Sequence, residues 1–439
     1  MSAKRIVIIL PTSYDDQGTL FKQKKATWPN LTILYLAAMV PKEHHVTVIE
    51  EAVEDINFDA SVDLVGLSVL TGNSKRAYDI AAEYRKRRVP VVMGGIHPTC
   101  MPDEAAQHAD SIVIGEAEDT WPALIEDFQR GTMKKIYQEV KRESLANLPY
   151  PRFDLIKPNR YRHISLNGSV IIPIQTSRGC PFNCDFCSVT RFWGRTLRYR
   201  PIEDVVQEIR MSRGKTICFT DDNFLSNPER TIELCNAIKL LKIKWFCQMD
   251  VNSYRREEVI KAMAESGCFM AFLGFESMDP NTLKRVGKGF NKPENYAEIF
   301  RVFSRFGIGI YASLIFGFGA DNPEVVKSTV DFLVANMARL AAFFPPSPNP
   351  GTDLYSKMKE AGKLTSEKWW LSSNPERIKY GPGEYSGLEL ARMAYKYFYS
   401  YPSMLKRFAS PKKNDLIPLI LNLALRNKIK KSPNLKAIL

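Results

Sequence analysis

Short apolar runs alternate with amphipathic stretches of helical period along the first 130 residues. The apolar runs occupy residues 5–10, 45–49, 63–70, 90–93 and 110–114. Runs of this length, separated by helical segments, are typical of strands buried in a parallel sheet. The pattern therefore predicts a Rossmann-like or flavodoxin-like α/β domain over residues 1–130, with five strands separated by four helices. Ligands of such sheets bind beyond the carboxyl ends of the strands.

Small and polar residues gather after three of these predicted strands. Thr71-Gly72-Asn73 follows the third run, Gly94-Gly95-Ile96-His97 the fourth, and Gly115-Glu116 the fifth. Because the carboxyl ends of parallel strands share one edge of the sheet, these positions are expected to face a common ligand. The residues of this domain predicted to contact it are Ser68, Leu70, Thr71, Gly94, Gly95, His97, Gly115 and Glu116.

A second series of apolar runs begins near residue 169. Its predicted strands are residues 169–176, 216–220, 245–249, 269–274, 309–316 and 340–344, and its predicted helices are residues 203–213, 228–241, 257–266, 295–306 and 323–336. Six strand–helix units without hairpin signals predict a (β/α)6 barrel, closed or partial, over residues 169–345, with its active site at the carboxyl ends of the strands. Pro149, Pro151 and Pro158 indicate a linker over residues 131–168. Residues 346–439 are expected to form a mainly helical C-terminal region with a basic tail.

Composition narrows the class of protein. Hydrophobic residues make up 45% and charged residues 25% of the chain, which excludes wholesale disorder. The apolar stretch over residues 416–425 is broken by Pro418 and Asn422, and it is much shorter than the ~18–20 residues of a membrane-spanning helix. Residues 6–10 lack the cleavage site of a signal peptide, so a cytoplasmic location is expected.

Much of the net charge of +13 lies in the C-terminal tail. Residues 405–439 contain nine Lys and Arg residues against one acidic residue, Asp415. In residues 411–431 an apolar stretch stands beside Lys412, Lys413, Arg426, Lys428, Lys430 and Lys431. That combination suits an interfacial helix, peripheral to the inner face of the membrane. A helix docked on the barrel with a solvated basic end fits the same pattern equally well.

The strongest chemical signal is the segment Arg178-Gly-Cys-Pro-Phe-Asn-Cys-Asp-Phe-Cys187, directly after the first predicted strand of the barrel. It holds Cys180, Cys184 and Cys187 on one loop. Eight cysteines in a chain without an export signal point to metal or redox chemistry rather than to disulfides. Three thiolates can hold a [4Fe–4S] cluster and leave one iron open for an external ligand. A zinc site would need a fourth ligand, and the next cysteine, Cys218, falls in a predicted strand.

The C-x-x-x-C-x-aromatic-C spacing, with Phe186 before the last cysteine, resembles the cluster loop of radical S-adenosylmethionine (SAM) enzymes. The resemblance implies that the open iron binds the amino and carboxylate groups of SAM. It also implies that one-electron reduction, from a partner such as ferredoxin or flavodoxin, cleaves SAM to methionine and a 5′-deoxyadenosyl radical. In such enzymes the cofactor performs the radical step, while the protein binds, orients and excludes water.

Later strand ends extend this resemblance over the barrel. Thr220-Asp221-Asp222 stands where the family carries Gly-Gly-Glu, Gly274-Phe-Glu-Ser277 where relatives carry a SAM-contacting Glu and Ser, and Phe316-Gly-Phe-Gly319 where a glycine turn lets the backbone approach adenine. The resemblance implies SAM contacts from Phe186, Asp221, Asp222, Gln248, Glu276, Ser277 and Gly317. Because Gly-Gly-Glu is replaced, the residue that reaches the amino group of SAM stays open.

Three segments of the N-terminal domain carry a second resemblance. Pro29–Ala38, Gly94–Thr99 and Ile114–Glu118 are similar to the cobalamin (B12)-binding domains fused ahead of the barrel in class B radical SAM methyltransferases. The classical cobalamin motif Asp-x-His-x-x-Gly is missing, since Asp15-Asp-Gln-Gly18 has no histidine. The resemblance therefore implies a cobalt without a protein imidazole on its lower face, or a domain that kept the fold and lost the cofactor.

The two resemblances imply a cobalamin-dependent methyltransferase acting on an unactivated carbon of an apolar substrate (a lipid, isoprenoid or tetrapyrrole) or of a natural product. They imply hydrogen abstraction followed by methyl transfer from methylcobalamin, which a second SAM regenerates. A non-methylating radical SAM enzyme that closes rings, rearranges or joins carbon atoms is the alternative. A methylthiotransferase acting on transfer RNA is disfavoured, because Cys100 stands alone in a domain where that class has three cluster cysteines, and a nucleic-acid partner is not expected.

Overall fold

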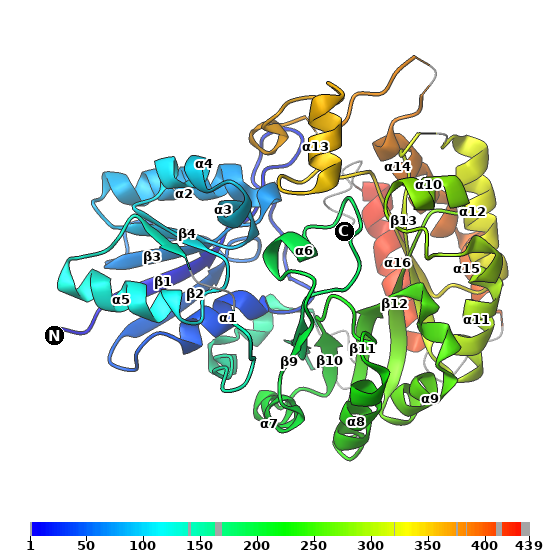
Figure 1. Ribbon diagram of the computed structural model, residues 1–439, viewed down its shortest axis with the longest axis horizontal. Helices are drawn as coiled ribbons and strands as arrows, with labels where there is room; N and C mark the ends of the chain where they lie inside the picture. The colour runs from blue at the N-terminus through cyan, green and yellow to red at the C-terminus, as the bar shows by residue number, and fades with distance from the viewer. Residues whose placement is uncertain are drawn as a thin grey trace.

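The computed structural model describes residues 2–138, 142–162, 169–319, 321–374, 376–382, 384–409 and 415–431. The N-terminal domain contains a parallel sheet with the strand order β2-β1-β3-β4-β5-β6 (Figure 1). Its strands are β1 (Arg5–Leu10), β2 (His45–Glu50), β3 (Leu64–Ser68), β4 (Val91–Gly94), β5 (Ser111–Ile114) and β6 (Ile136–Gln138). The first five agree with the predicted strands to within two residues, and their order is that of flavodoxin-like sheets.

Helices bury both faces of this sheet. One face packs against α1 (Leu31–Ala38) and α5 (Thr120–Arg130), and the other against α2 (Ser74–Lys86) and α4 (Pro102–His108). Burial on both faces explains why the strands appear in the sequence as continuous apolar runs rather than alternating ones. The short helix α3 (Ile96–Cys100) and the turn η1 (Thr71–Asn73) follow the carboxyl ends of β4 and β3.

Strand β6 lies in the segment that the prolines assign to a linker. It pairs in parallel with β5, so the sheet has six strands rather than five. An edge strand of three residues is too short for hydrophobic periodicity to reveal. The turns η2 (Phe153–Leu155) and η3 (Pro158–Arg160) follow, and Phe153 and Ile156 pack against the cores of both domains. The described part of this segment is therefore a packed arm.

The second α/β alternation forms a partial barrel, as predicted. Its six strands are parallel, in the order β14-β13-β12-β11-β10-β7, and β7 and β14 do not pair with each other in the described chain. The strands are β7 (Ile171–Ile174), β10 (Thr216–Phe219), β11 (Lys244–Met249), β12 (Cys268–Glu276), β13 (Gly309–Ile315) and β14 (Leu340–Phe344). The helices and turns around them are α7 (Ile202–Ser212), α8 (Pro228–Lys239), η4 (Val251–Arg255), α9 (Glu257–Glu265), α10 (Pro280–Arg285), η5 (Pro293–Asn295), α11 (Tyr296–Arg305) and α12 (Pro323–Ala335).

One antiparallel pair departs from the expectation of a barrel without hairpins. Strands β8 (Ser177–Arg178) and β9 (Arg198–Tyr199) pair at the base of the loop that holds the three cysteines and α6 (Val189–Phe192). Each strand has two residues, too few to leave a hairpin signal in the sequence. The pairing places Arg178 opposite Arg198, and both face the N-terminal domain through ion pairs with Glu116.

The open edge of the barrel is covered by helix α14 (Gly387–Phe398). The hydroxyl of Tyr399 accepts a hydrogen bond from the Ala341 N–H and donates one to the Ala341 carbonyl, at 3.2 and 2.8 Å. The hydroxyl of Tyr395 accepts from the Phe343 N–H at 3.2 Å. Tyrosines four residues apart on one helix face thus match alternate residues of β14, so the helix satisfies a strand edge that would otherwise be open.

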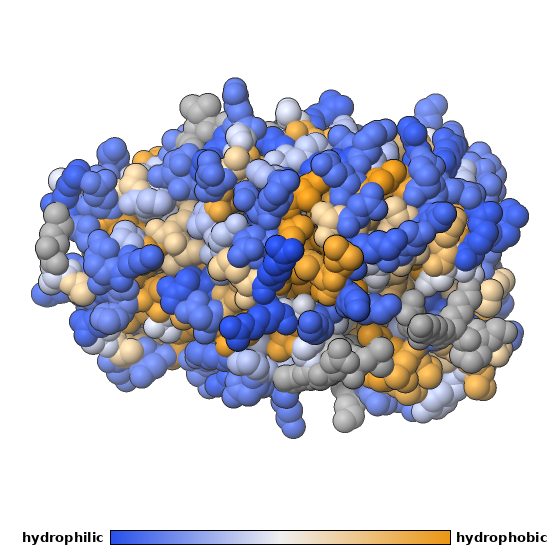
Figure 2. All heavy atoms as spheres, turned by 90° about the horizontal axis from the view of Figure 1, so that it is seen from below, coloured by the Kyte–Doolittle hydropathy of each residue, from blue (hydrophilic) through white to orange (hydrophobic). Residues whose placement is uncertain are grey.

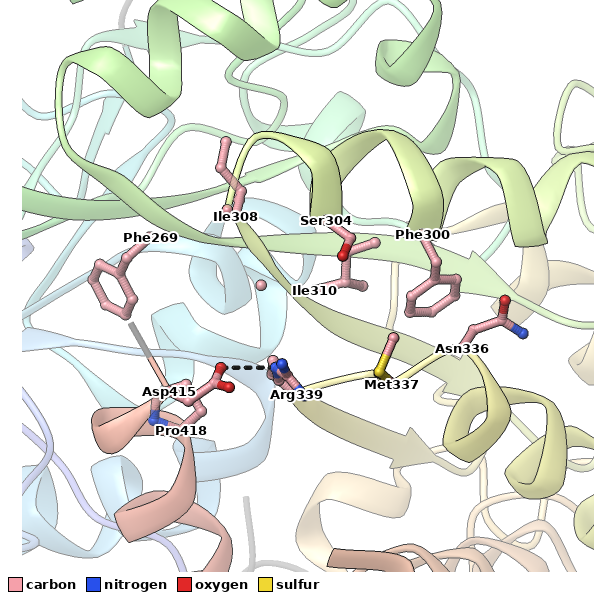
Figure 3. A pocket seen from close by; sticks show the side chains of 12 residues that line it. Phe269, Phe300, Ser304, Ile308, Ile310, Asn336, Met337, Arg339, Asp415 and Pro418 are labelled. Atoms are coloured by element: carbon pink, nitrogen blue, oxygen red, sulfur yellow. Dashed lines mark ion pairs between the residues drawn. The ribbon is translucent and has the colours of Figure 1, made fainter. Parts of the chain in front are cut away.

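The remaining elements of the C-terminal region are α13 (Asp353–Glu360), η6 (Trp369–Leu371), α15 (Tyr401–Arg407) and α16 (Leu416–Lys431). Helix α16 docks below the amino ends of β13 and β14. Figure 3 shows Arg339 and Asp415 pointing toward one another there, with Nε and Oδ1 2.8 Å apart, beside a cavity of about 30 Å³. Asn422 donates to the Arg339 carbonyl at 2.8 Å. The tail is thus a docked helix over its described part, and Lys412 and Lys413 lie outside the described residues.

No helix in the described ranges is both long enough and apolar enough to cross a membrane.

Candidate active site

The cysteine loop begins with a glycine that no other residue could replace without a backbone shift. Gly179 has a φ of +97°, and a Cβ atom added there would lie 2.3 Å from the Thr196 carbonyl oxygen. This close approach lets the chain leave β8 and turn at once into Cys180. The loop therefore sits at the carboxyl end of β7, between the two domains, as the barrel prediction requires (Figure 1).

The three cysteines share one partly buried environment. Burial raises the pKa of the Cys184 thiol to about 12, and the neighbouring Cys187 and Cys180 contribute to the rise. Burial likewise raises the pKa of Cys187 to about 11 and that of Cys180 above its usual value. The ammonium of Lys288 lowers the pKa of all three, so a cation lies near the thiols.

The donor set suits a cluster better than a single ion. Among the described residues, no three His, Cys, Asp or Glu side chains are close enough to hold one metal ion. A [4Fe–4S] cluster does not need such closeness, since each thiolate binds a different iron. Cys218, the nearest further cysteine along the chain, is buried in β10 as a small core residue. The zinc alternative therefore finds no support in these residues.

Asp221 is occupied within the fold. Its carboxylate accepts hydrogen bonds from the Thr176 N–H and hydroxyl, at 3.2 and 2.8 Å, and from the hydroxyl of Ser177. It is fully buried, and burial raises its pKa. Asp221 thus ties the end of β10 to the end of β7. These hydrogen bonds give Asp221 a positioning role, and its contact with SAM stays a prediction.

Asp222 points the other way. Its Oδ2 atom is buried and has no hydrogen-bond partner among the described residues. Burial, with the charge of Asp221, raises its pKa to about 7. Its own charge raises the pKa of Cys180 and Cys187, so it lies on the side of the cysteine loop. Gln248 donates to the Asp222 carbonyl at 3.2 Å and is otherwise exposed at the barrel mouth.

Glu276 lies at the end of β12 in a strained backbone conformation, with a φ of +64°. Its carboxylate is 3.1 Å from the ammonium of Lys288, and its charge contributes to the raised pKa of Cys184. The structure thus places Glu276 beside Lys288 and near the cluster loop, and its contact with SAM stays a prediction. Ser277 is turned toward the next helix, where its hydroxyl accepts from the Asp279 N–H at 3.0 Å.

Phe186 and Gly317, both predicted to contact SAM, differ in their surroundings. The Phe186 ring lies in the cysteine loop, 6.1 Å from the ring of Phe318. Gly317 has a φ of +108°, but a Cβ there would lie 2.6 Å from the Gly387 Cα and 2.7 Å from the Tyr380 hydroxyl. A close approach that requires glycine is therefore made to the first residue of helix α14, and the backbone contact of Gly317 with SAM stays a prediction.

A cavity of about 490 Å³ lies between the two domains. Six of the residues predicted to contact a ligand line it: Ser68, Leu70, Gly94, Gly95, Gly115 and Glu116. The barrel contributes Gln175, Arg178, Ser188, Val189, Phe192 and Trp193 to the opposite wall. Because Ser188 and Val189 directly follow Cys187, the cysteine loop forms part of the same cavity as the glycine-rich strand ends.

Thr71 and His97 do not line this cavity, contrary to expectation. Thr71 lies in the turn η1, where its carbonyl accepts from the hydroxyl of Ser74, the first residue of α2. His97 is fully buried, because helix α3 turns its ring toward the core, 2.9 Å from the Tyr78 hydroxyl and packed on the ring of Trp370. The position of His97 after a predicted strand did not indicate that helix α3 begins at Ile96 and points the His97 side chain into the core.

Buried ion pairs join the cavity walls. Arg178 Nη1 lies 2.6 Å from Glu116 Oε2, Arg178 also pairs with Glu118, and Arg198 Nη2 lies 2.7 Å from Glu116 Oε1. The Arg178 guanidinium stacks on the ring of Trp193. Arg178 is not among the residues predicted for the site. The two acidic residues of Ile114–Glu118, Glu116 and Glu118, could have indicated it, because buried carboxylates need a cation nearby.

The cavity fits a corrinoid that lacks a protein imidazole. Its floor is made of strand ends, where Gly115 has open space within 4 Å of its missing Cβ. Neither histidine nor cysteine is among the described residues that line it. The walls are mainly apolar and aromatic, with a few polar groups, as is usual for cofactor cavities.

Comparisons with known proteins agree with this geometry. The family described as the radical SAM superfamily matches residues 174–333, and the B12 binding domain family matches residues 21–125. The chain is 31% identical to the bacteriochlorophyllide d C-12(1)-methyltransferase of Chlorobaculum tepidum, over 82% of this chain and 79% of that protein. It is 26% identical to the hopanoid C-2 methylase of Rhodopseudomonas palustris, over 83% of this chain and 72% of that protein.

A solved structure shares the whole architecture. The radical SAM methyltransferase TsrM from Kitasatospora setae, solved with cobalamin and a [4Fe–4S] cluster bound, has a TM-score of 0.64 and 17% sequence identity, and the match covers 89% of this chain and 81% of TsrM. The two family matches give the cofactors of this enzyme as a [4Fe–4S] cluster, SAM and cobalamin. The chain belongs to the cobalamin-dependent radical SAM methyltransferase family.

Proposed function

We propose that this enzyme methylates an unactivated carbon of an apolar substrate, such as a tetrapyrrole, an isoprenoid or a hopanoid-like lipid. One observation carries the proposal: the residues after Cys187 and the glycine-rich ends of β3, β4 and β5 line a single cavity. Cluster and corrinoid would thus face each other across it. The names of two relatives, which act on a bacteriochlorophyllide and on hopanoids, support an apolar substrate.

The cluster and SAM have proposed ligands in the chain. Cys180, Cys184 and Cys187 hold the cluster, and Asp222, with its unpartnered buried oxygen, accepts from the amino group of SAM. When bound, these cofactors supply radical chemistry and a methyl group. The protein supplies a cavity between its two domains, a cation at Lys288 beside the thiolates, and a wall fixed by Arg178. A one-electron donor such as ferredoxin or flavodoxin completes the proposal.

The cluster assignment is tested by replacing each cysteine of the loop with alanine. Each variant should lose the iron–sulfur absorption and the formation of 5′-deoxyadenosine, because three thiolates are the minimum set. Cys100→Ala, which truncates a half-buried cysteine of α3, is the matched control and should keep both. Near-normal turnover in a variant lacking all three loop cysteines would refute the assignment.

The corrinoid assignment is tested by spectroscopy of protein reconstituted with cobalamin. A base-off spectrum without a histidine ligand is expected, since the described lining of the cavity has no imidazole. If the purified protein binds no corrinoid in any redox state, methyl transfer is excluded and a cobalamin-free radical reaction replaces it. Substrate class is read from anaerobic incubation with lipid and pigment extracts, followed by mass spectrometry for a gain of about 14 mass units.

We also propose that the enzyme works in contact with the inner face of the membrane, through its C-terminal helices. Apolar substrates of the proposed kind partition into bilayers. The basic tail has nine Lys and Arg residues in residues 405–439, and those other than Arg407, which is fully buried, support such contact.

A further inference from the structure

Helix α16 is apolar on two opposite sides. Ile417 is buried, and Leu421 and Leu425 pack against the barrel core. On the outer side Leu416, Ile420 and Leu423 are 52%, 48% and 43% exposed. These three positions follow the i, i+4, i+7 spacing of one helical stripe, so their side chains form a continuous apolar strip facing outward.

This strip is not a general property of the surface helices. On the outer face of α12, Glu324, Lys327, Ser328 and Asp331 are exposed and polar, and the one exposed apolar residue of this helix is Ala335 at its end. A helix that covers a core on one side normally carries such polar residues on the other. The outer side of α16 therefore has apolar side chains that packing of the described chain does not use.

Neighbouring helices extend the strip and add cations. On α15, Tyr401 is 54% and Leu405 is 74% exposed. The Arg426 guanidinium lies 3.9 Å from the centre of the Tyr401 ring and Lys430 6.0 Å from it, which joins α15 to the outer side of α16. Figure 2, seen from below, shows orange atoms gathered at the lower right, in the barrel half of the molecule.

A hollow of about 440 Å³ lies beside this strip. Its lining is Tyr395, Lys396, Tyr399, Arg426, Ile429 and Lys430. Three cations and no carboxylate are among these residues. The Nε atom of Arg426 is buried and has no hydrogen-bond partner in the described chain. Such a hollow is complementary to an anion, and Arg is well suited to a phosphate group.

We propose that α14, α15 and α16 form a docking surface for an anionic phospholipid bilayer. Leu405, Leu416, Ile420 and Leu423 enter the boundary between headgroups and acyl chains, and the hollow receives a headgroup phosphate. Apolar insertion together with basic residues is the combination that binds helices to anionic membranes. This proposal rests on the proposed function only in one respect: an apolar substrate would explain why the enzyme binds membranes. The binding itself requires neither substrate nor turnover.

The test is flotation of the full-length, cofactor-loaded enzyme with phosphatidylcholine vesicles, with or without phosphatidylglycerol. Binding to the anionic vesicles is expected to exceed binding to neutral ones by about tenfold and to weaken with salt. The variant Leu416→Ser/Ile420→Ser/Leu423→Ser should lose about tenfold in binding. The pair Lys396→Gln/Lys430→Gln should lose the preference for anionic vesicles. Leu240→Ser, at an 87% exposed leucine after α8, is the matched control and should bind normally.

The outcomes are distinguishable. Absence of vesicle binding by the unchanged enzyme, equal binding by the triple variant, or no preference for anionic vesicles overturns the proposal. The proposal is also overturned if the unchanged enzyme forms a dimer that the triple variant abolishes and neither protein binds vesicles. Binding of inorganic phosphate without binding of vesicles overturns it as well. If the triple variant unfolds at a lower temperature than the unchanged enzyme, Leu423→Ser and the lysine pair replace it. Methyl transfer in detergent, measured separately, reports on the proposed function and leaves this result unaffected.

Discussion

Arg178 is the residue that most directly joins the two halves of the site. It is buried, it pairs with Glu116 and Glu118 of the N-terminal domain, and it precedes Cys180 by two residues. A charge in this setting stabilises the fold only while its partners are present, because each carboxylate has lost its water. Its position thus couples the wall of the corrinoid cavity to the cluster loop.

Replacing Arg178 by Gln should lower the free energy of unfolding by about 3 kcal/mol, since two buried carboxylates lose a cation. Arg191→Gln, which breaks an exposed pair with Asp353, should cost less than about 1 kcal/mol. Urea unfolding at neutral pH measures both. Equal losses in the two variants would show that burial of the Arg178 pairs has no special weight.

Gly317 and Gly131 illustrate two different reasons why a position requires glycine: a close contact with another segment, and a positive φ alone. Both have a positive φ, but a Cβ at Gly131 would meet nothing within 4 Å, whereas one at Gly317 would meet the Gly387 backbone at 2.6 Å. Gly131→Ala should therefore cost about 1 kcal/mol of unfolding free energy, from backbone strain alone. Gly317→Ala should cost at least about 3 kcal/mol, because α14 must also move. Thermal unfolding of the two variants gives the comparison, and similar melting temperatures would contradict the contact.

At the scale of elements, helix α14 takes the place of a barrel-closing strand. Its Tyr395 and Tyr399 hydroxyls pair with the outer edge of β14. An unpaired edge strand would be prone to aggregation, so this helix has both a packing and a protective role.

Tyr399→Phe should lower the free energy of unfolding by about 2 kcal/mol, because the buried N–H and carbonyl of Ala341 lose their partner. Tyr397→Phe is the matched control on the same helix, at a 47% exposed ring, and should change stability by less than about 0.5 kcal/mol. Chemical denaturation of both variants is the measurement. No difference between them would mean that water replaces the hydroxyl at the strand edge.

At the scale of the whole molecule, Glu104 holds the N-terminal domain against the C-terminal region. Its carboxylate accepts from Tyr78 at 2.9 Å and Trp370 at 2.7 Å and lies 2.9 Å from the Lys368 ammonium. Burial tends to raise its pKa, but the hydrogen bonds from these groups and His97 outweigh it, so the pKa of Glu104 is held below its usual value near 4.5.

A lowered pKa in the folded state means that the contribution of Glu104 to stability is fully present above about pH 4.5 and is lost as the pH falls further. Glu104→Gln should therefore cost about 2 kcal/mol, constant from pH 8 to about pH 5 and smaller at lower pH. Glu126→Gln on the exposed side of α5 should cost little at any pH. Unfolding curves across this pH range test the sign. A cost that grows as the pH falls would contradict it.

The sequence alone determined the fold class, most strands and the cysteine loop. Buried parallel strands leave continuous apolar runs, and three thiols at short spacing on one loop have few other uses. These are local signals, carried by residues close together in the chain. Short elements such as β6, β8 and β9 gave no such signal, because two or three residues hold no period.

The tertiary structure alone decided which of the predicted residues face the site. Asp221 and Asp222 are adjacent and chemically alike, yet the carboxylate of Asp221 is bound by Thr176 and Ser177, whereas the Oδ2 atom of Asp222 has no hydrogen-bond partner among the described residues. The His97 ring points into the core, and Gly317 packs closely against α14. Arg178 forms ion pairs with residues some 60 positions earlier in the chain. Which way a side chain points depends on partners that are distant in sequence and meet only when the domains pack. The pattern of hydrophobic and polar residues in the sequence therefore does not predict these long-range contacts.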